Sequence, residues 1–235
     1  MSSAWKWGIW FVLTGVAVTV SYLWFDRPIA LFVHDRLQGV NVFALVPHVP
    51  NLLAPAAFIA LVAVGLRGLT GQPLSRLETA MVLAAASLAV ANVIKDKLKY
   101  AFGRTWPETW VRNNPSFIQD GIYGFNPFHG GEGYASFPSG HTTAICAVMS
   151  VLWICYPRFR ILYAACIAAV AIGLVGADFH FLADVIAGGF LGATIGWLTV
   201  VVWELGDHNV RAPSERTERI STAADNEPIS AAPRH

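Results

Sequence analysis

Residues 138–184 read PSGHTTAICAVMSVLWICYPRFRILYAACIAAVAIGLVGADFHFLAD, and two long apolar runs fill most of this stretch. The first run follows His141, the second ends near His180, and Pro157–Arg160 form a short turn between them. A short connection between two helices makes them antiparallel neighbours, so the chain returns to the face from which it started. We therefore expect His141 and His180 to meet at one face of a helical bundle.

The composition of the whole chain indicates a membrane protein. Hydrophobic residues make up 55% of the 235 residues and charged residues 13%, whereas a soluble globular domain carries roughly 25% charged residues. This composition excludes a disordered chain and argues against a soluble enzyme. The formal net charge is +1, whereas nucleic-acid-binding proteins carry clustered basic residues. We therefore expect no nucleic-acid partner.

Six stretches are apolar enough to cross a bilayer, which takes about 20 residues in a helix. They run over Trp7–Phe25, Leu52–Leu66, Thr79–Ile94, His141–Tyr156, Ile161–Ala177 and Val185–Trp203. The sequence thus predicts an all-α integral membrane protein with six transmembrane helices in one domain over residues 1–203. An even number of spans places both termini on the same side of the membrane.

Three segments outside these spans have their own expected structures. Asp26–Leu37 mixes charges with apolar residues, which is typical of an amphipathic helix in the membrane interface. The loop between helices 3 and 4 is long and rich in aromatic residues, so we expect a folded cap over about 105–137. Residues 204–235 are polar and lack a hydrophobic period, which predicts a disordered tail.

The last apolar run carries a row of glycines at four-residue spacing. Residues this far apart share one face of a helix, and a face of small residues lets another helix approach closely. We expect close helix packing along the row formed by Gly188, Gly192 and Gly196.

Several ionisable residues are expected at the same membrane face as the two histidines. Lys97, Lys99 and Arg104 come just beyond the third span, and Asp184 lies at the start of the sixth. Ionisable residues that converge at the ends of membrane helices indicate a functional site. Asp184 is four residues after His180, so on a helix its carboxylate can bond one ring nitrogen and leave the other free to react.

The start of the fourth helix adds an anion site. Unpaired N–H groups and the positive end of the helix dipole favour a bound anion, and Gly140 allows close approach of the ligand while Ser139 can cap or donate. Cations, a helix N-terminus, two histidines and one aspartate together suit displacement at a phosphoryl group, which needs charge stabilisation, a nucleophile and a proton for the leaving oxygen. The sequence offers no carboxylate pair for a metal, so we expect neither metal nor cofactor.

These residues resemble the motifs of the phosphatidic acid phosphatase type 2 superfamily, which read Lys-x6-Arg-Pro, Pro-Ser-Gly-His and Ser-Arg-x5-His-x3-Asp. The resemblance covers roughly residues 95–189. The second motif matches fully at residues 138–141. The third keeps His180 and Asp184 but has Gly173 and Leu174 where the family has Ser-Arg.

The first motif fits in two registers. Lys97 with Arg104 has the family spacing, but Thr105 replaces the proline. Lys99 with Pro107 restores the proline, but Trp106 stands at the arginine position. The departures in the first and third motifs remove up to two guanidinium groups. Each stabilising donor in such a site is worth ~100-fold or more in rate, and Arg112 in the cap is a candidate replacement.

The resemblance implies a role for each matched residue. His180 would be the nucleophile that forms a phosphohistidine, Asp184 would orient it, and His141 would protonate the leaving oxygen. The implied phosphate-binding groups are Lys97 or Lys99, Arg104, Ser139 and the Gly140 amide.

The expected function is hydrolysis of a lipid phosphate or lipid pyrophosphate monoester without a metal, at a site reached from the bilayer. The resemblance implies a bacterial inner membrane, an active site on the periplasmic face and cytoplasmic termini. The alternatives are phosphotransfer from a lipid pyrophosphate, a non-catalytic lipid-phosphate binder or transporter, and a membrane haem protein in which the two histidines are axial ligands. The sequence leaves the lipid, the lysine and the oligomeric state open.

Overall fold

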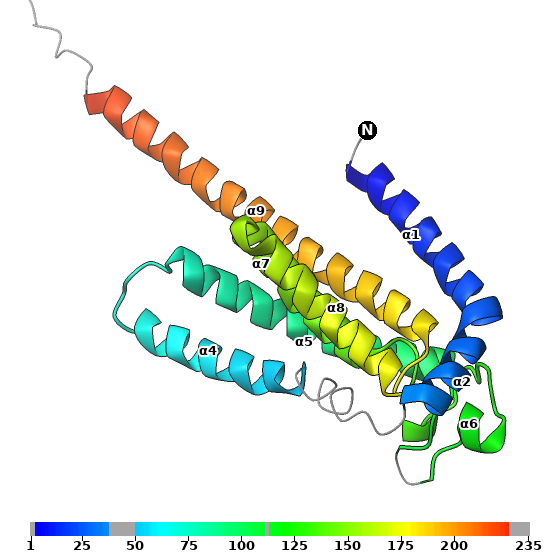
Figure 1. Cartoon of the computed structure of the whole chain (residues 1–235). Coiled ribbons are helices and arrows are strands. Elements are labelled where there is room, and N and C mark those ends of the chain that lie inside the picture. The colour runs from blue at the N-terminus through cyan, green and yellow to red at the C-terminus, as the bar shows by residue number, and fades with distance from the viewer. Residues whose placement is uncertain (1–2, 38–49, 111–112, 226–235) are drawn as a thin grey trace, which may run out of the picture. The chain divides into compact units, whose positions relative to one another are not determined.

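The computed structural model describes residues 3–37, 50–110 and 113–225, and their regular structure is helical apart from isolated bridges (Figure 1). The elements are α1 (Ser3–Val20), the π-helical η1 (Ser21–Phe25), α2 (Asp26–Leu37), α4 (Leu53–Gly68), α5 (Arg76–Phe102), α6 (Phe117–Asp120), the 3-10 turn η3 (Glu132–Tyr134), α7 (Gly140–Cys155), the 3-10 turn η4 (Pro157–Phe159), α8 (Arg160–Gly176) and α9 (Leu182–Asp225). Among the described residues, those up to Thr199 and those from Val200 onward form two compact units, and the candidate site lies in the first.

Five helical stretches in the described residues are long and apolar enough to cross a membrane, where the sequence predicted six. They are Trp5–Leu37, Pro50–Gly68, Arg76–Phe102, Pro157–Gly176 and Leu182–Gly206. The remaining predicted span is α7, an apolar helix of 16 residues that rises only about 24 Å at 1.5 Å per residue. Ser139 caps its start, and Pro157 follows its end, where the ring cannot continue an α-helix.

The outward surfaces of α1 and α4 are apolar, as a lipid environment requires. Phe11 is 68% exposed and Phe58 is 69% exposed. Large aromatic side chains exposed in such numbers are unusual for a monomeric soluble protein. These surfaces therefore support insertion of the helices into a bilayer.

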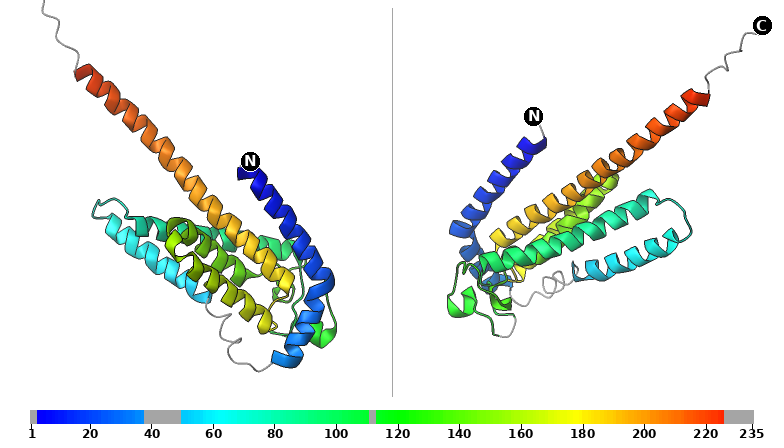
Figure 2. Two further views of the ribbon diagram at one scale, coloured as in Figure 1. Left: turned by 45° about the horizontal axis from the view of Figure 1, so that its top comes forward. Right: turned by 180° about the vertical axis from the view of Figure 1, so that it is seen from behind.

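Helix α5 contacts both α4 and α7, and α8 packs on the other flank of α7 (Figures 1 and 2). A capping box formed by Ser75 and Glu78 starts α5, because each satisfies a backbone N–H of the other residue. Gly103 ends the helix in the left-handed conformation, with φ 58°, which glycine adopts without steric cost. One core cluster lies among α7, α8 and α9 and consists of Ile145, Cys146, Val170, Leu174 and Val185.

The glycine row of α9 packs against α7, which confirms the expected close approach. A β-carbon at Gly192 would lie 2.3 Å from the carbonyl oxygen of Thr143, and one at Gly196 would lie 2.5 Å from that of Ala147. Real side chains do not tolerate such distances. The first turns of the two helices are also joined, because Ser139 N donates to Asp184 O over 3.0 Å.

Two segments outside the predicted spans are helical. The helix expected over Asp26–Leu37 is confirmed as α2, which follows α1 through η1, while its place at the membrane interface stays a prediction. The polar stretch from residue 204, expected to be disordered, differs: α9 continues to Asp225. Extending an existing helix adds one hydrogen bond per residue and avoids the cost of nucleation, so polar residues can follow an apolar span.

The loop from α5 to α7 is structured over its described residues and contains α6 and η3. Arg104 forms bridges to Phe125 and to Ala135, so the start of the loop is held by two later segments. Aromatic rings of the loop pack on one another, including Phe125 against Phe137 at a centroid distance of 5.3 Å. Arg112, the candidate replacement cation, lies outside the described residues.

Candidate active site

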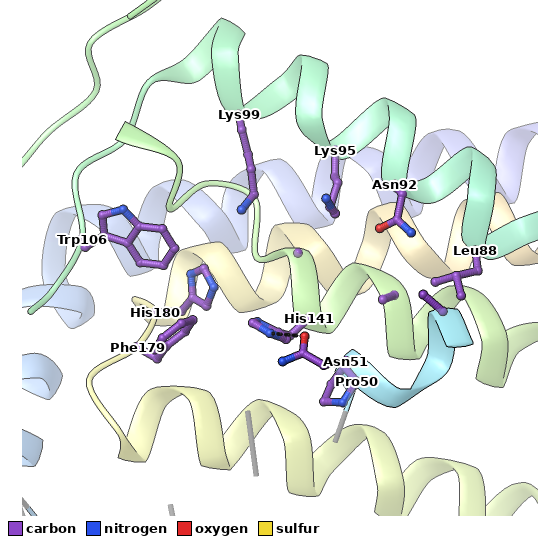
Figure 3. Close-up of a pocket in the computed structure, with 13 residues that line it drawn as sticks. Pro50, Asn51, Leu88, Asn92, Lys95, Lys99, Trp106, His141, Phe179 and His180 are labelled. Atoms are coloured by element: carbon purple, nitrogen blue, oxygen red, sulfur yellow. Dashed lines mark hydrogen bonds between the residues drawn. The ribbon is translucent and has the colours of Figure 1, made fainter. Parts of the chain in front are cut away.

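His141 and His180 lie together, with ring centroids 6.4 Å apart. His141 is in the first turn of α7, and His180 lies in the short connection between α8 and α9. Figure 3 shows both rings at the same cavity, with Phe179 beside them. The antiparallel path of α7 and α8 produces this meeting, as the sequence indicates.

The His180 ring is buried and is held from one side. Its Nδ1 lies 3.4 Å from Asp184 Oδ2 and 3.3 Å from Ser136 Oγ. The Ser136 hydroxyl donates its own proton to the same Asp184 oxygen over 2.6 Å. Ser136 Oγ and Asp184 Oδ2 are therefore both acceptors toward Nδ1 of His180. These partners assign the ring proton to Nδ1 and leave Nε2 as the unprotonated nitrogen.

Burial lowers the pKa of His180 below its ordinary value, against the opposing effect of the hydrogen bond with Asp184. The ring is therefore neutral at neutral pH. A neutral imidazole with one nitrogen bonded to a carboxylate has its other nitrogen available for attack or proton transfer. The arrangement provides a nucleophile or a base at this position.

The Asp184 carboxylate is fixed from its other side by Arg104. Arg104 Nη1 donates to Asp184 Oδ1 over 2.5 Å, and Nη2 donates to Asp26 Oδ2 over 2.6 Å. All three side chains are fully buried. Burial opposes the charge on Arg104, but the Asp184 and Asp26 carboxylates outweigh it and raise the pKa of Arg104. A buried charge is tolerated only when it is paired in this way.

Aromatic rings complete the surroundings of the Arg104 guanidinium. Its central carbon lies 4.4–5.4 Å from the ring centroids of four residues, a distance at which cation–π attraction is significant. These residues are Tyr22, Tyr123, Phe125 and Phe181. Arg104 therefore ties α2, the cap loop and the start of α9 together behind Asp184.

A cavity of about 320 Å³ opens in front of the histidines. Its walls come from α5, α7, the segment before α4 and the loop around Trp106 (Figure 3). The lining residues are Pro50, Asn51, Ala54, Leu88, Asn92, Lys95, Lys99, Trp106, Gly140, His141, Ala144, Phe179 and His180. Nε2 of His141 lies 3.2 Å from Oδ1 of Asn51, so an amide from the α4 side contacts this histidine.

The structure brings some of the sequence-predicted residues to the cavity and places others elsewhere. Lys99, Gly140, His141 and His180 line it. Asp184 stands directly behind His180, and Ser139 is a buried cap whose hydroxyl accepts from Thr142 Oγ1 over 3.0 Å. Lys97 is exposed and is not a lining residue.

Arg104, predicted to bind phosphate, does not line the cavity. The physical reason is that its two terminal nitrogens are already bonded to Asp184 and Asp26. In this structure it holds a carboxylate instead of facing a ligand.

Sequence reasoning missed several residues of the site. Lys95 and Asn92 precede Lys99 by four and seven positions, so helical spacing could have placed them on its face. Asp26 and Ser136 reach Arg104 and Asp184 from distant segments, and no local pattern marks them. No group of three or more potential metal-ligating side chains occurs in the described ranges, and the absence of a metal stays a prediction.

The helices and this site together define a class: a membrane-spanning helical protein with a buried histidine–aspartate pair facing a second histidine and cations across a cavity. The PAP2 superfamily model matches residues 80–205, more than half of the chain. The chain belongs to the PAP2 superfamily, and its apolar helices make it an integral membrane protein.

Two curated relatives are similar over 117 residues. The lipid A 1-phosphatase of Rhizobium johnstonii is 32% identical, and that of Rhizobium etli is 31% identical. Each match covers 50% of this chain and 45% or 47% of the relative, so the matched region spans about half the length of these proteins. Their full activity does not transfer to this chain on similarity alone.

A solved structure shares the fold. The crystal structure of a transmembrane PAP2-type phosphatidylglycerolphosphate phosphatase from Bacillus subtilis matches with a TM-score of 0.59 and 19% sequence identity. The match covers 87% of this chain and 97% of that one. The arrangement of helices is therefore the same, while the low identity says nothing about the substrate.

Proposed function

We propose that this chain is a membrane phosphatase that hydrolyses a lipid phosphate or lipid pyrophosphate monoester through a phosphohistidine on His180. One observation carries the proposal: His180 lines a cavity opposite His141 while its Nδ1 is held by Asp184 and Ser136. With Nδ1 held, Nε2 is the ring nitrogen left to react with a ligand in the cavity. The same cavity holds two lysines that can stabilise a phosphoryl anion.

The reaction has two displacement steps. Nε2 of His180 attacks phosphorus, the N–P bond forms, and the bond to the ester oxygen breaks as His141 donates a proton to that oxygen. Water then attacks the phosphohistidine, His141 accepts a proton from the water, and the N–P bond breaks to release phosphate. Asp184 stabilises the imidazolium that forms when His180 is phosphorylated.

A lipid fits the cavity better than a small soluble ester. One part of its lining is cationic, through Lys95 and Lys99, and another part is apolar, through Ala54, Leu88 and Ala144. The lining helices α4 and α5 are also candidate membrane spans. An amphiphile can therefore place its phosphate at the histidines and its acyl chains toward the bilayer. A periplasmic location of this face and cytoplasmic termini belong to the same proposal.

One feature favours a second candidate, a lipid-phosphate binder without turnover. Leu174 stands where the family motif has an arginine, and it is completely buried in the apolar core. A pocket that has lost a guanidinium stabilises the transition state less well. The test below separates binding from hydrolysis.

The test is phosphate release by purified protein from a panel of lipids. The panel contains phosphatidic acid, phosphatidylglycerol phosphate, undecaprenyl pyrophosphate and lipid A 1-phosphate, each with and without an acceptor lipid. Wild type is compared with His180→Ala and with His129→Ala, a control at an exposed cap histidine that does not line the cavity.

We expect release by wild type and the control and none by His180→Ala. Equal release by wild type and His180→Ala would overturn the proposal. Phosphate or vanadate binding without turnover on any lipid would favour the binder, and product formation only with an acceptor would show phosphotransfer.

A further inference from the structure

The cavity is lined by few cationic side chains, although the proposed ligand is a phosphoryl group with negative charge. A phosphate monoester carries about two negative charges near neutral pH. Trp106 and Leu174 stand at the two motif positions of arginine, in the Lys99 register of the first motif. Leu174 is in the core, and Arg104 is bonded to two carboxylates behind the site. Among the described lining residues, the positively charged side chains other than histidine are those of Lys95 and Lys99.

Lys95 is not part of the family motif, but it lies on the same face of α5 as Lys99. Residues four apart are neighbours on a helix surface. Figure 3 shows both side chains extending from α5 toward the cavity, on the side opposite His141. Asn92 and Leu88 continue this face along the helix, and both line the cavity.

The two lysines also converge on the first residue of α7. A β-carbon at Gly140 would lie 3.2 Å from Cδ and 3.3 Å from Cε of Lys95, and 3.6 Å from Nζ of Lys99. The start of α7 presents its unpaired N–H groups at this point, which favours an anion. The stem of Lys95 and the ammonium group of Lys99 therefore lie beside the N-terminus of α7, next to His141.

The present partner of Lys95 leaves it able to bind a ligand. Its Nζ donates to Asp96 Oδ1 over 2.6 Å. The Lys95 side chain is 18% exposed, whereas that of Asp96 is 65% exposed. Such a solvent-exposed pair contributes little. An ammonium has three N–H donors, so further donors remain for phosphoryl oxygens.

We propose that Lys95 is a second phosphate-binding cation, which acts with Lys99 across Gly140 and supplies charge that the family motif takes from arginine. The proposal rests on the proposed function in one respect: it takes the ligand of this cavity to be a phosphoryl group. Lys95 binds the equatorial oxygens in the ground state and, as charge develops during displacement, in the transition state.

The test uses Lys95→Met, which removes the charge and keeps the stem that passes over Gly140. Lys95→Arg tests whether a cation at this place suffices. Lys6→Met, at an exposed lysine near the start of α1, is the control for loss of one positive charge. Two quantities are measured for each variant: the dissociation constant of inorganic phosphate and of orthovanadate by calorimetry, and kcat/KM for the best lipid of the panel.

We expect Lys95→Met to weaken phosphate and vanadate binding by about tenfold or more, and to lower kcat/KM by about 10–100-fold, as for a lost hydrogen bond to a charged group. Lys95→Arg should recover most of the affinity, and Lys6→Met should match wild type. Binding by Lys95→Met within twofold of wild type would overturn the proposal. An equal loss in Lys6→Met would also overturn it by showing a general effect of charge.

The two proposals fail in different ways. Equal turnover by wild type and His180→Ala rejects the hydrolytic mechanism but leaves the calorimetric comparison of Lys95→Met with wild type intact. If Lys95→Met does not fold, Lys95→Gln is measured in its place, because it also removes the charge and retains a polar end.

Discussion

Arg104 and Asp184 are 80 residues apart in the sequence, yet Nη1 of Arg104 donates to Oδ1 of Asp184 over 2.5 Å in a fully buried pair. The other carboxylate oxygen, Oδ2, lies 3.4 Å from Nδ1 of His180. Asp184 thus connects a buried cation to the proposed nucleophile. On the far side of Arg104, Asp26 of α2 completes the chain of charges.

Asp26→Asn tests whether this chain of charges positions the site. Asp26 accepts from Arg104, Ser21 Oγ and Ala183 N, and the amide cannot neutralise the cation. Breaking a buried pair on one side costs about 3–5 kcal/mol, so we expect a large fall in the apparent melting temperature in detergent. At a temperature where the variant is folded, kcat should fall while KM changes little.

The matched control for Asp26→Asn is Asp35→Asn, which removes an exposed carboxylate from the same helix. It should melt at the wild-type temperature. An Asp26→Asn protein with wild-type stability and kcat would show that Arg104 holds Asp184 without help from α2.

Two glycines of α9, one inside the glycine row and one beside it, offer a matched comparison. A β-carbon at Gly192 would lie 2.3 Å from Thr143 O and 2.8 Å from Cys146 Cβ, whereas at Gly189 the nearest atom would be 3.8 Å away. Forcing a methyl group into a packed contact costs roughly 1–3 kcal/mol. We expect Gly192→Ala to lower the apparent melting temperature and Gly189→Ala to leave it nearly unchanged. Equal melting of the two variants would contradict the close packing of α7 and α9.

Asp178 predicts a pH dependence of stability. Burial raises the pKa of Asp178 to about 7, and Glu108 adds to this effect while His34 opposes it. Nδ1 of His34 lies 3.2 Å from Glu108 and 3.7 Å from Asp178. The folded state therefore binds a proton more tightly than the unfolded state, and Asp178 becomes more destabilising as the pH rises from about 4 to about 7.

Asp178→Asn removes this titration without disturbing the backbone. Asp178 has φ 52°, and asparagine is among the residues that tolerate the left-handed region. We expect the variant to melt higher than wild type at pH 8, with a smaller difference at pH 5. A difference that is constant between these pH values would contradict the raised pKa.

The sequence predicts the parts of this fold that depend on periodic pattern. Apolar runs located the helices, and the antiparallel path of two of them placed His141 beside His180. Capping signals located the start of α7, and the i, i+4 spacing paired His180 with Asp184. The predicted span His141–Tyr156 is present as α7, which is shorter than the other apolar helices because a cap at Ser139 and a proline at position 157 bound it.

The rest of the site depends on contacts that no local pattern records. Arg104 was predicted to bind phosphate because of its position near a motif, and the structure shows its charge bonded to Asp26 and Asp184. Asp26 precedes Arg104 by 78 residues, and only the packed structure brings them together. Lys95 is different from Asp26, because its four-residue spacing from Lys99 can be seen in the sequence. Only the structure shows that both lysines line the cavity.

The most direct test of the central claim is to trap the covalent intermediate. Wild type and His180→Ala are mixed with a radiolabelled lipid phosphate, quenched in alkali during the first turnover, and digested for peptide mapping. We expect a labelled phosphohistidine in the peptide that contains His180 in wild type and no label in the variant. Turnover by wild type with the label on another residue, or wild-type turnover by His180→Ala, would contradict it.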